Sequence, residues 1–150
     1  MAFENDFETV ASAKLYVCAT RPTADTAVAY AALTWVEVGE ITNMPGVVGR
    51  EYSTSTLSTI GSAHEREKKG SYKLPSAEFE CAWVESDAGQ IIIGTAANDY
   101  SIPSFKVVKQ GAGLRYFTAQ VSKFLEKMGT SNDAVKGSFT LLRQSNTIIA

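Results

Sequence analysis

A long polar segment, residues 49–70, lies between two strand-like stretches and constrains the folds that this chain can adopt. Its sequence is GREYSTSTLSTIGSAHEREKKG, in which the large apolar side chains are Tyr52, Leu57 and Ile60. Connections longer than about 12–15 residues are uncommon inside compact domains and are usually functional loops or disordered linkers. The strand-like stretches on both sides argue against a linker. We therefore predict a single domain with a long polar loop, residues 50–72, which becomes ordered against a partner.

The charges are distributed unevenly along the 150 residues. Residues 1–100 contain 14 acidic and 7 basic side chains, whereas residues 101–150 contain 2 acidic and 7 basic ones, for a formal net charge of −2. A chain of this length can bury a core without disulfides or metal. The charge separation is therefore either neutralised within one subunit or steers neighbouring copies into a head-to-tail arrangement.

Most of the remaining sequence has the pattern of β-strands. The clearest alternation lies in residues 73–85, with apolar side chains on one face and glutamates on the other. The first face carries Ala77, Phe79, Cys81 and Trp83, and the second carries Glu78, Glu80 and Ala82. The other predicted strands are residues 14–20, 33–42, 100–110, 114–124 and 134–142. Short connections between them predict a mainly β fold, a β-sandwich or β-barrel of about six to eight strands.

One segment has the features of a helix. Asp87 followed three residues later by Gln90 is typical of a helix N-terminus, and residues 88–97 place apolar side chains on one side. We predict one α-helix over residues 87–97, packed against the sheet. In the last strand, the core-facing residues are expected to be Val135, Phe139 and Leu141.

The sequence offers few of the convergent reactive groups that an enzyme needs. His64 is the single histidine and lies in the charged run of residues 64–69, so a solvated side chain is expected. Cys18 and Cys81 each lie in an apolar stretch and are expected to be buried thiols, although a Cys–His pair is formally possible. We therefore predict that the chain is not an enzyme and holds no metal and no cofactor.

Three further kinds of site are disfavoured. Glu78 and Glu80 share one strand face, where a solvated surface is favoured over an acid/base or metal site. The glycines at 46–49 and 111–113 do not lead into a helix, as a phosphate-binding loop would. Basic residues of the last third alternate with aromatic ones, but the strand pattern places Phe117 in the core and so weakens the case for nucleic-acid stacking.

Neither a signal peptide nor a membrane span is predicted. The N-terminal sequence MAFENDFETV is acidic and has no basic residue before Lys14, unlike a secretory signal. No apolar run in the sequence approaches the roughly 18–20 residues needed to cross a bilayer. We expect a soluble protein that is made in the cytoplasm.

The order of these features is informative. It comprises a strand with TWVEVGEIT, a turn at NMPG, a polar arm that ends in EREKKG, a strand with SAEFECAW, a capped helix with DAGQIIIGTAA and a final hairpin. Over almost the whole chain this order resembles the tail tube protein of long-tailed bacteriophages, the major tail protein whose rings stack into the tube. Related tubes occur in contractile tails and in the type VI secretion system. The resemblance implies a β-sandwich-like barrel with one flanking helix, assembled into hexameric rings whose inner sheets line a continuous lumen.

The resemblance also implies roles for particular residues. The arm from Ser53 to Tyr72 would reach a neighbouring subunit or ring. The residues of this expected contact are Ser53, Thr54, Leu57, Ile60, His64, Glu65, Arg66, Glu67, Lys68, Lys69 and Tyr72. In the N-terminal arm, residues 1–12, Phe3 and Phe7 would make a second contact or pack on their own subunit. Glu78 and Glu80 are candidates for the lumen face, where carboxylates would repel DNA and let it slide.

The implied partners are further copies of the chain and the tail completion, tape measure and tail tip proteins, with DNA passing through without specific binding. The implied location is the virion tail, after assembly in the host cytoplasm. One alternative is a monomeric β-barrel that binds a small ligand or protein partner, which predicts a preformed apolar cavity and no polymer. Another is a small hydrolase, which predicts loss of activity when Cys81, Glu78 or Glu80 is changed.

Overall fold

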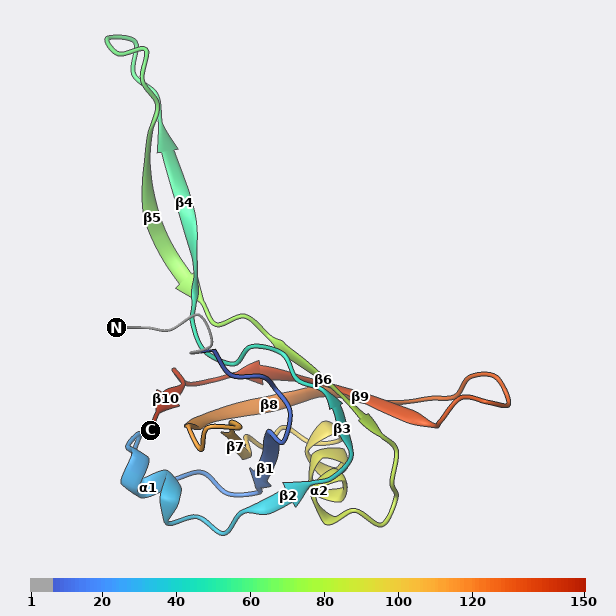
Figure 1. The fold of residues 1–150 in the computed structure, drawn as a ribbon. Coiled ribbons are helices and arrows are strands. Elements are labelled where there is room, and N and C mark those ends of the chain that lie inside the picture. The colour runs from blue at the N-terminus through green and yellow to red at the C-terminus, as the bar shows by residue number, and fades with distance from the viewer. Residues whose placement is uncertain (1–6) are drawn as a thin grey trace.

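The computed structural model describes residues 7–150 and is mainly β (Figure 1). Its elements are β1 (Lys14–Cys18), α1 (Ala27–Ala31), β2 (Val36–Val38), β3 (Ile41–Asn43), β4 (Glu51–Leu57), β5 (Arg66–Lys73), β6 (Ala77–Ala82), α2 (Ala88–Ala97), β7 (Ser104–Val108), β8 (Leu114–Lys127), β9 (Lys136–Arg143) and β10 (Ile148–Ile149). The predicted class, a β-sandwich or barrel with a flanking helix, is confirmed. No helix in this part of the chain is long and apolar enough to cross a membrane.

Eight strands form one curled sheet. Seven follow the order β2-β1-β7-β8-β9-β6-β3, and β10 pairs with β8. Because β2 and β3 lie at opposite ends of this order and are separated in sequence by Gly39 and Glu40, the sheet must curl until its ends meet. The curled sheet has two layers, one with β2, β1, β7 and β10 and the other with β9, β6 and β3. The long strand β8 belongs to both, since its first part pairs with β7 and its last part with β9. A register shift between Val121 and Lys123 marks the bend.

The prediction of one strand over residues 33–42 is wrong, because the segment is split between the two layers. Glu40 has a φ of 60°, a left-handed backbone conformation that interrupts a strand. The Asp87 carboxylate accepts hydrogen bonds from the backbone N–H of Gly39 at 3.1 Å and of Gln90 at 3.0 Å. The cap of α2 therefore also holds the corner that joins β2 to β3. The helix itself, residues 88–97, is confirmed.

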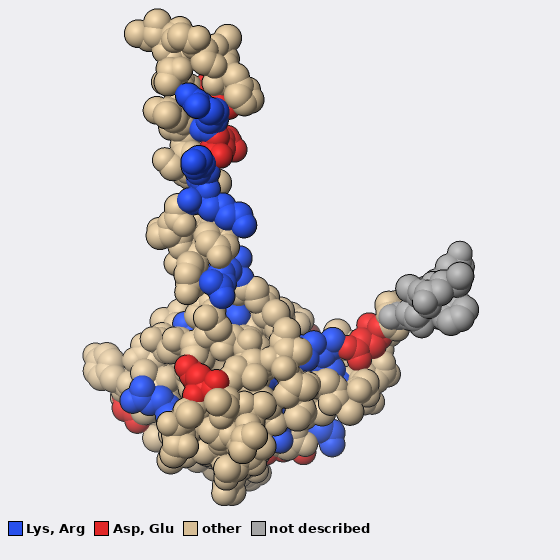
Figure 2. Space-filling model, turned by 90° about the vertical axis from the view of Figure 1, so that its left-hand side faces the viewer, with Lys and Arg blue, Asp and Glu red and all other residues tan. Residues whose placement is uncertain are grey.

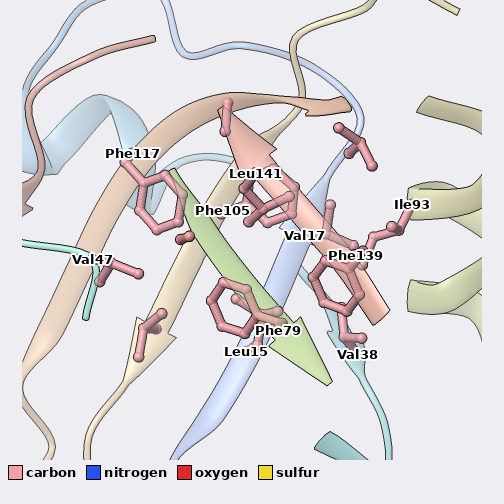
Figure 3. Packing of buried hydrophobic residues seen from close by; sticks show 14 of the residues in the cluster. Leu15, Val17, Val38, Val47, Phe79, Ile93, Phe105, Phe117, Phe139 and Leu141 are labelled. Carbon is pink, nitrogen blue, oxygen red and sulfur yellow. The ribbon is translucent and has the colours of Figure 1, made fainter. Parts of the chain in front are cut away.

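The core lies between the two layers. The alternation of apolar residues in the sequence correctly predicts most of the side chains that face it. Phe79 of β6 stacks on Phe139 of β9 with ring centroids 5.2 Å apart, and Phe105 of β7 stacks on Phe117 of β8 at 5.6 Å (Figure 3). All four rings are fully buried, and burial of each contributes about 1.5–3 kcal/mol. Val135 is a wrong prediction: it precedes β9 and is 41% exposed, because the inward alternation begins only with the strand.

Two short elements were not predicted from the sequence. Helix α1 has five residues and buries Tyr30, whose ring stacks on Tyr116 at 5.3 Å. Strand β10 has two residues, and Ile148 pairs with Tyr116. Elements this short show no hydrophobic period, so their positions depend on tertiary contacts. Cys18 and Cys81 are buried free thiols, as predicted.

Candidate assembly surface

Strands β4 and β5 form a two-stranded hairpin that projects from the barrel into solvent (Figure 1). Every residue of both strands is exposed. The expectation that residues 50–72 lack regular structure is therefore wrong. Sequence analysis missed the strands because neither face of the hairpin contacts a core, so no apolar alternation marks them. β-branched residues such as Thr54 and Thr56 favour the extended conformation.

One face of the hairpin is organised by aromatic and cationic side chains near its root. Tyr52 and Tyr72 are directly opposite each other, with ring centroids 5.5 Å apart. The Lys69 ammonium lies 4.6 Å from the Tyr52 ring centroid, and the Arg50 guanidinium lies 4.3 Å from that of Tyr72. At exposed sites each such cation–π contact contributes about 0.5–1 kcal/mol. These contacts stiffen the lower part of the hairpin without burying it.

The opposite face and the tip differ in character. Lys73, Lys68 and Arg66 share the opposite face, since they pair in turn with Glu51, Ser55 and Leu57. Figure 2 shows Lys and Arg side chains along the length of the hairpin. Residues 50–73 contain five basic and three acidic side chains. Towards the tip, Leu57 is 59% exposed and Ile60 is fully exposed. The hairpin therefore presents cations along its length and apolar side chains at its end.

An isolated two-stranded hairpin is marginally stable in water. In the described residues, β4 and β5 pair only with each other, so the outer edge of each strand has free N–H and C=O groups. Such edges can pair with strands of another chain. The arrangement is suited to binding strands of another protein chain.

The root of the hairpin contains a buried arginine that sequence analysis missed. Arg143, at the end of β9, is 7% exposed and donates hydrogen bonds to the backbone carbonyls of Val47, Gly49 and Pro75. Burial lowers the pKa of its guanidinium. A sequence signal existed: Phe139, Leu141 and Arg143 alternate, so Arg143 occupies a core-facing position where a charge is unusual.

The structure brings the predicted contact residues together on the hairpin. Ser53, Thr54, Leu57, Arg66, Glu67, Lys68, Lys69 and Tyr72 lie on its strands, and Ile60, His64 and Glu65 lie in its turn. Phe3 lies outside the described residues. Phe7 is exposed, while the neighbouring Glu8 accepts a hydrogen bond from the backbone N–H of Gly111 at 2.9 Å and pairs with Lys109. The side-chain hydrogen bond from Lys109 lowers the pKa of Glu8. These contacts of Glu8 anchor the start of the described chain on the β7–β8 turn.

The outer face of β6, β9 and β8 contains Glu78 and Glu80, as predicted, but also lysines. Cross-strand pairing aligns Glu78 of β6 with Thr140 of β9 and Lys123 of β8. It also aligns Ala82 of β6 with Lys136 of β9 and Lys127 of β8. The Lys127 ammonium lies 3.9 Å from the Glu80 carboxylate. This exposed face therefore carries both signs of charge.

The described part of the chain shows no metal site: no three His, Cys, Asp or Glu residues within residues 7–150 are placed to share an ion. A surface hollow of about 480 Å³ lies between the N-terminal segment, the hairpin root and the β7–β8 turn. Between the two layers lies the buried apolar cluster, which includes four phenylalanine rings (Figure 3).

No protein-family model matches the sequence, and a search of the curated proteins gives no match. Solved structures do match. A chain of the six-fold symmetrised baseplate of the anti-feeding prophage has a TM-score of 0.65 at 7% identity, over 100% of this chain and 97% of that one. A chain of the extended sheath–tube complex of the PVC extracellular contractile injection system has a TM-score of 0.65 at 10% identity, covering 98% and 93%. A chain of the tail of an empty GTA particle, computed with C6 symmetry, has a TM-score of 0.63 at 9% identity, covering 91% and 94%.

The chain has the fold of these tail and injection-system chains. At identities of 7–10% the backbone arrangement is shared while almost all side chains differ. The contacts that this chain makes must therefore be derived from its own residues.

Proposed function

We propose that the chain is a structural subunit of a phage tail tube, which assembles into stacked, hexameric rings through its hairpin. The observation that carries this proposal is the fully exposed hairpin β4–β5 on a barrel with a complete core. The six-fold baseplate, the sheath–tube complex and the C6 tail among the structures of this fold support rings of six copies. A structural rather than a catalytic role is part of the proposal.

Docking on a neighbouring copy would stabilise the hairpin, which is marginally stable on its own. A closed ring needs a heterologous contact that repeats by rotation, and a stack of rings needs another. Burial of Leu57 or Ile60 against a neighbour contributes about 1.5–3 kcal/mol for each side chain. Because every copy makes the same contact, a modest energy for one hairpin is multiplied along the assembly.

The charge distribution favours contact between unlike parts of two copies. The hairpin, residues 50–73, has five basic and three acidic side chains, whereas the rest of the chain has 13 acidic and 9 basic ones. A basic hairpin that meets the acidic body of the next copy brings opposite charges together, and two hairpins that meet each other do not. This polarity favours a repeating head-to-tail arrangement.

The tube would be the conduit through which DNA passes into the host cell. We assign its lumen to the outer face of β6, β9 and β8. There Glu78 and Glu80 offset Lys123, Lys127 and Lys136, so the face is close to neutral rather than repelling, and tight binding of phosphates is not favoured. The partners are other copies and the tail completion, tape measure and tail tip proteins. Assembly takes place in the host cytoplasm, and the final location is the virion tail.

Negative-stain electron microscopy of the purified chain over a concentration series tests the proposal. We expect rings or tubes from the intact chain and monomers from a variant that lacks residues 53–69, which keeps the barrel. The double variant Leu57→Ser with Ile60→Ser should also lose assembly, while Val28→Ser, an exposed position on α1, should keep it. Monomers of the intact chain at every concentration would contradict self-assembly and favour the binding module instead.

A further inference from the structure

We infer that Arg143 is a positioning residue that sets the direction in which the hairpin β4–β5 leaves the barrel. The connection into β4 contains Val47 and Gly49, and the connection out of β5 contains Pro75. The guanidinium donates from Nη1 to the Val47 carbonyl and from Nη2 to the Gly49 carbonyl, both at 2.6 Å, and from Nε to the Pro75 carbonyl at 3.1 Å. One side chain of the barrel thus holds both connections of the hairpin.

The donors of this buried cation are directed to backbone oxygens. Nη1 also donates to the Thr147 hydroxyl at 3.1 Å, and that hydroxyl donates to the Val47 carbonyl. Within residues 7–150, no salt bridge involves Arg143. A charge desolvated in this way is costly unless its hydrogen bonds are made. The planar fork of arginine fixes the angles between its partners, which the single ammonium of lysine does not.

Few other interactions hold the root. In the described part of the chain, the backbone hydrogen bonds of turns and loops involve none of residues 44–50 or 74–76. The Val47 side chain is buried in the core and anchors the first connection. Two residues later Gly49 has a φ of 108°, a conformation that side-chain-bearing residues rarely adopt, so the chain changes direction there. Without Arg143, the hairpin would pivot about Gly49.

A fixed direction matters for assembly, and this consequence depends on the proposed tube function. A ring closes only when each contact repeats at the same angle. A hairpin that is already held at this angle loses less conformational entropy when it docks. Arg143 therefore acts on assembly through the hairpin and touches no partner itself.

The direct test measures the distance between the hairpin and the barrel in the folded monomer. Spin labels on Ser55→Cys in β4 and Ile91→Cys in α2 report the distance between the hairpin and the barrel by pulsed EPR. Both sites are exposed, and the native Cys18 and Cys81 are buried and so protected from labelling. We expect one narrow distance peak from the otherwise unchanged chain and loss of that peak in Arg143→Met and Arg143→Lys. The matched control is Arg115→Lys, since among residues 7–150 the Arg115 side chain donates to the carbonyl of its neighbour Leu114 and to no other residue.

The outcomes separate positioning from general stability. A narrow peak at the same distance in Arg143→Met overturns the inference, whatever its unfolding midpoint. Should that variant not fold, Thr147→Val removes one partner, keeps the buried guanidinium and is expected to broaden the peak; an unchanged peak there also overturns it. Electron microscopy then reports assembly: Arg143→Lys should give fewer and less regular tubes. Absence of tubes from the unmodified chain contradicts the proposed function, while the distance measurement still decides on Arg143.

Discussion

The barrel and the hairpin β4–β5 both pair aromatic rings across strands, but only the barrel buries them. Phe79 and Phe139 stack at 5.2 Å inside the core and are fully buried. Tyr52 and Tyr72 lie at nearly the same separation, 5.5 Å, in a hairpin where every strand residue is exposed. Similar local contacts therefore have different consequences. In the barrel they belong to one buried core, whereas in the hairpin they stabilise a segment whose strand residues are all exposed.

This difference separates folding from assembly within one chain. The barrel buries one continuous apolar cluster between its two layers, so we expect it to fold as a single chain. The hairpin keeps its strand edges free and its apolar tip exposed, at a cost in stability that contact with another copy would offset. Substitutions should therefore divide into those that unfold the monomer and those that leave it folded.

The largest expected effect on stability is that of Phe139→Ala. The ring of Phe139 stacks on Phe79 and lies edge-on to Phe124 at 5.7 Å, so its removal leaves a cavity in the core. We expect the free energy of unfolding, measured by urea denaturation, to fall by about 3–5 kcal/mol. The matched change in the hairpin, Tyr72→Ala, should alter it by less than about 0.5 kcal/mol. Similar losses in the two variants would show that the hairpin is part of the same cooperative unit.

The barrel should also lose stability at alkaline pH through Cys81. Burial raises the pKa of this thiol from 9.0 to about 11, because ionisation inside the core is unfavourable. Above pH 9 the unfolded chain releases this proton and the folded chain does not, so stability falls as pH rises from 9 to 11. The contribution lost over this window is roughly 2–3 kcal/mol. Urea denaturation at several pH values measures the slope.

Two variants show where this slope originates. Cys81→Ala removes the thiol and should flatten the pH dependence of the unfolding free energy. The chain that lacks residues 53–69 should keep the slope of the unmodified chain, since the thiol lies in the barrel. A flatter slope in the hairpin deletion would mean that the two regions are coupled.

Sequence reasoning succeeded for long segments with apolar alternation or a helix cap, and it failed to find the strands of the exposed hairpin. Alternation located the buried residues of β6, and the Asp87 cap located α2, because both signals are local. The hairpin residues were found as a candidate contact only by their lack of a core pattern. Their strand structure was missed for the same reason.

The remaining errors concern interactions between distant parts of the chain. The split of residues 33–42 depends on the Asp87 carboxylate, 48 residues beyond Gly39. The role of Arg143 depends on carbonyls up to 96 residues away. Alternation places Arg143 inward, but only the tertiary fold shows which oxygens it meets. Such information is absent from local patterns.

Glycines give a finer comparison of the two regions. A Cβ added at Gly137 would lie 2.8 Å from the Trp83 ring and 2.9 Å from the Phe124 ring, whereas one added at Gly61, in the hairpin turn, would meet nothing within 4 Å. Gly137→Ala should therefore cost about 1–3 kcal/mol through overpacking. Gly61→Ala should leave the urea midpoint unchanged. If Gly137→Ala proved neutral, the aromatic pair beside it would have room to shift, and the barrel would be less tightly packed than its geometry indicates.

The smallest expected effect lies within the hairpin itself. Lys69→Ala removes the cation above the Tyr52 ring, a contact that contributes about 0.5–1 kcal/mol at an exposed site. We expect β4 and β5 to open independently of the barrel, because they form a separate, fully exposed sheet, so the change should appear as roughly two- to five-fold faster hydrogen exchange of hairpin amides. The unfolding midpoint of the barrel should not move. Lys68→Ala is the matched control, since Lys68 lies on the other face, opposite Ser55. A lower unfolding midpoint in Lys69→Ala would place the hairpin within the folding unit of the barrel, and assembly would then act on an element that is already stable.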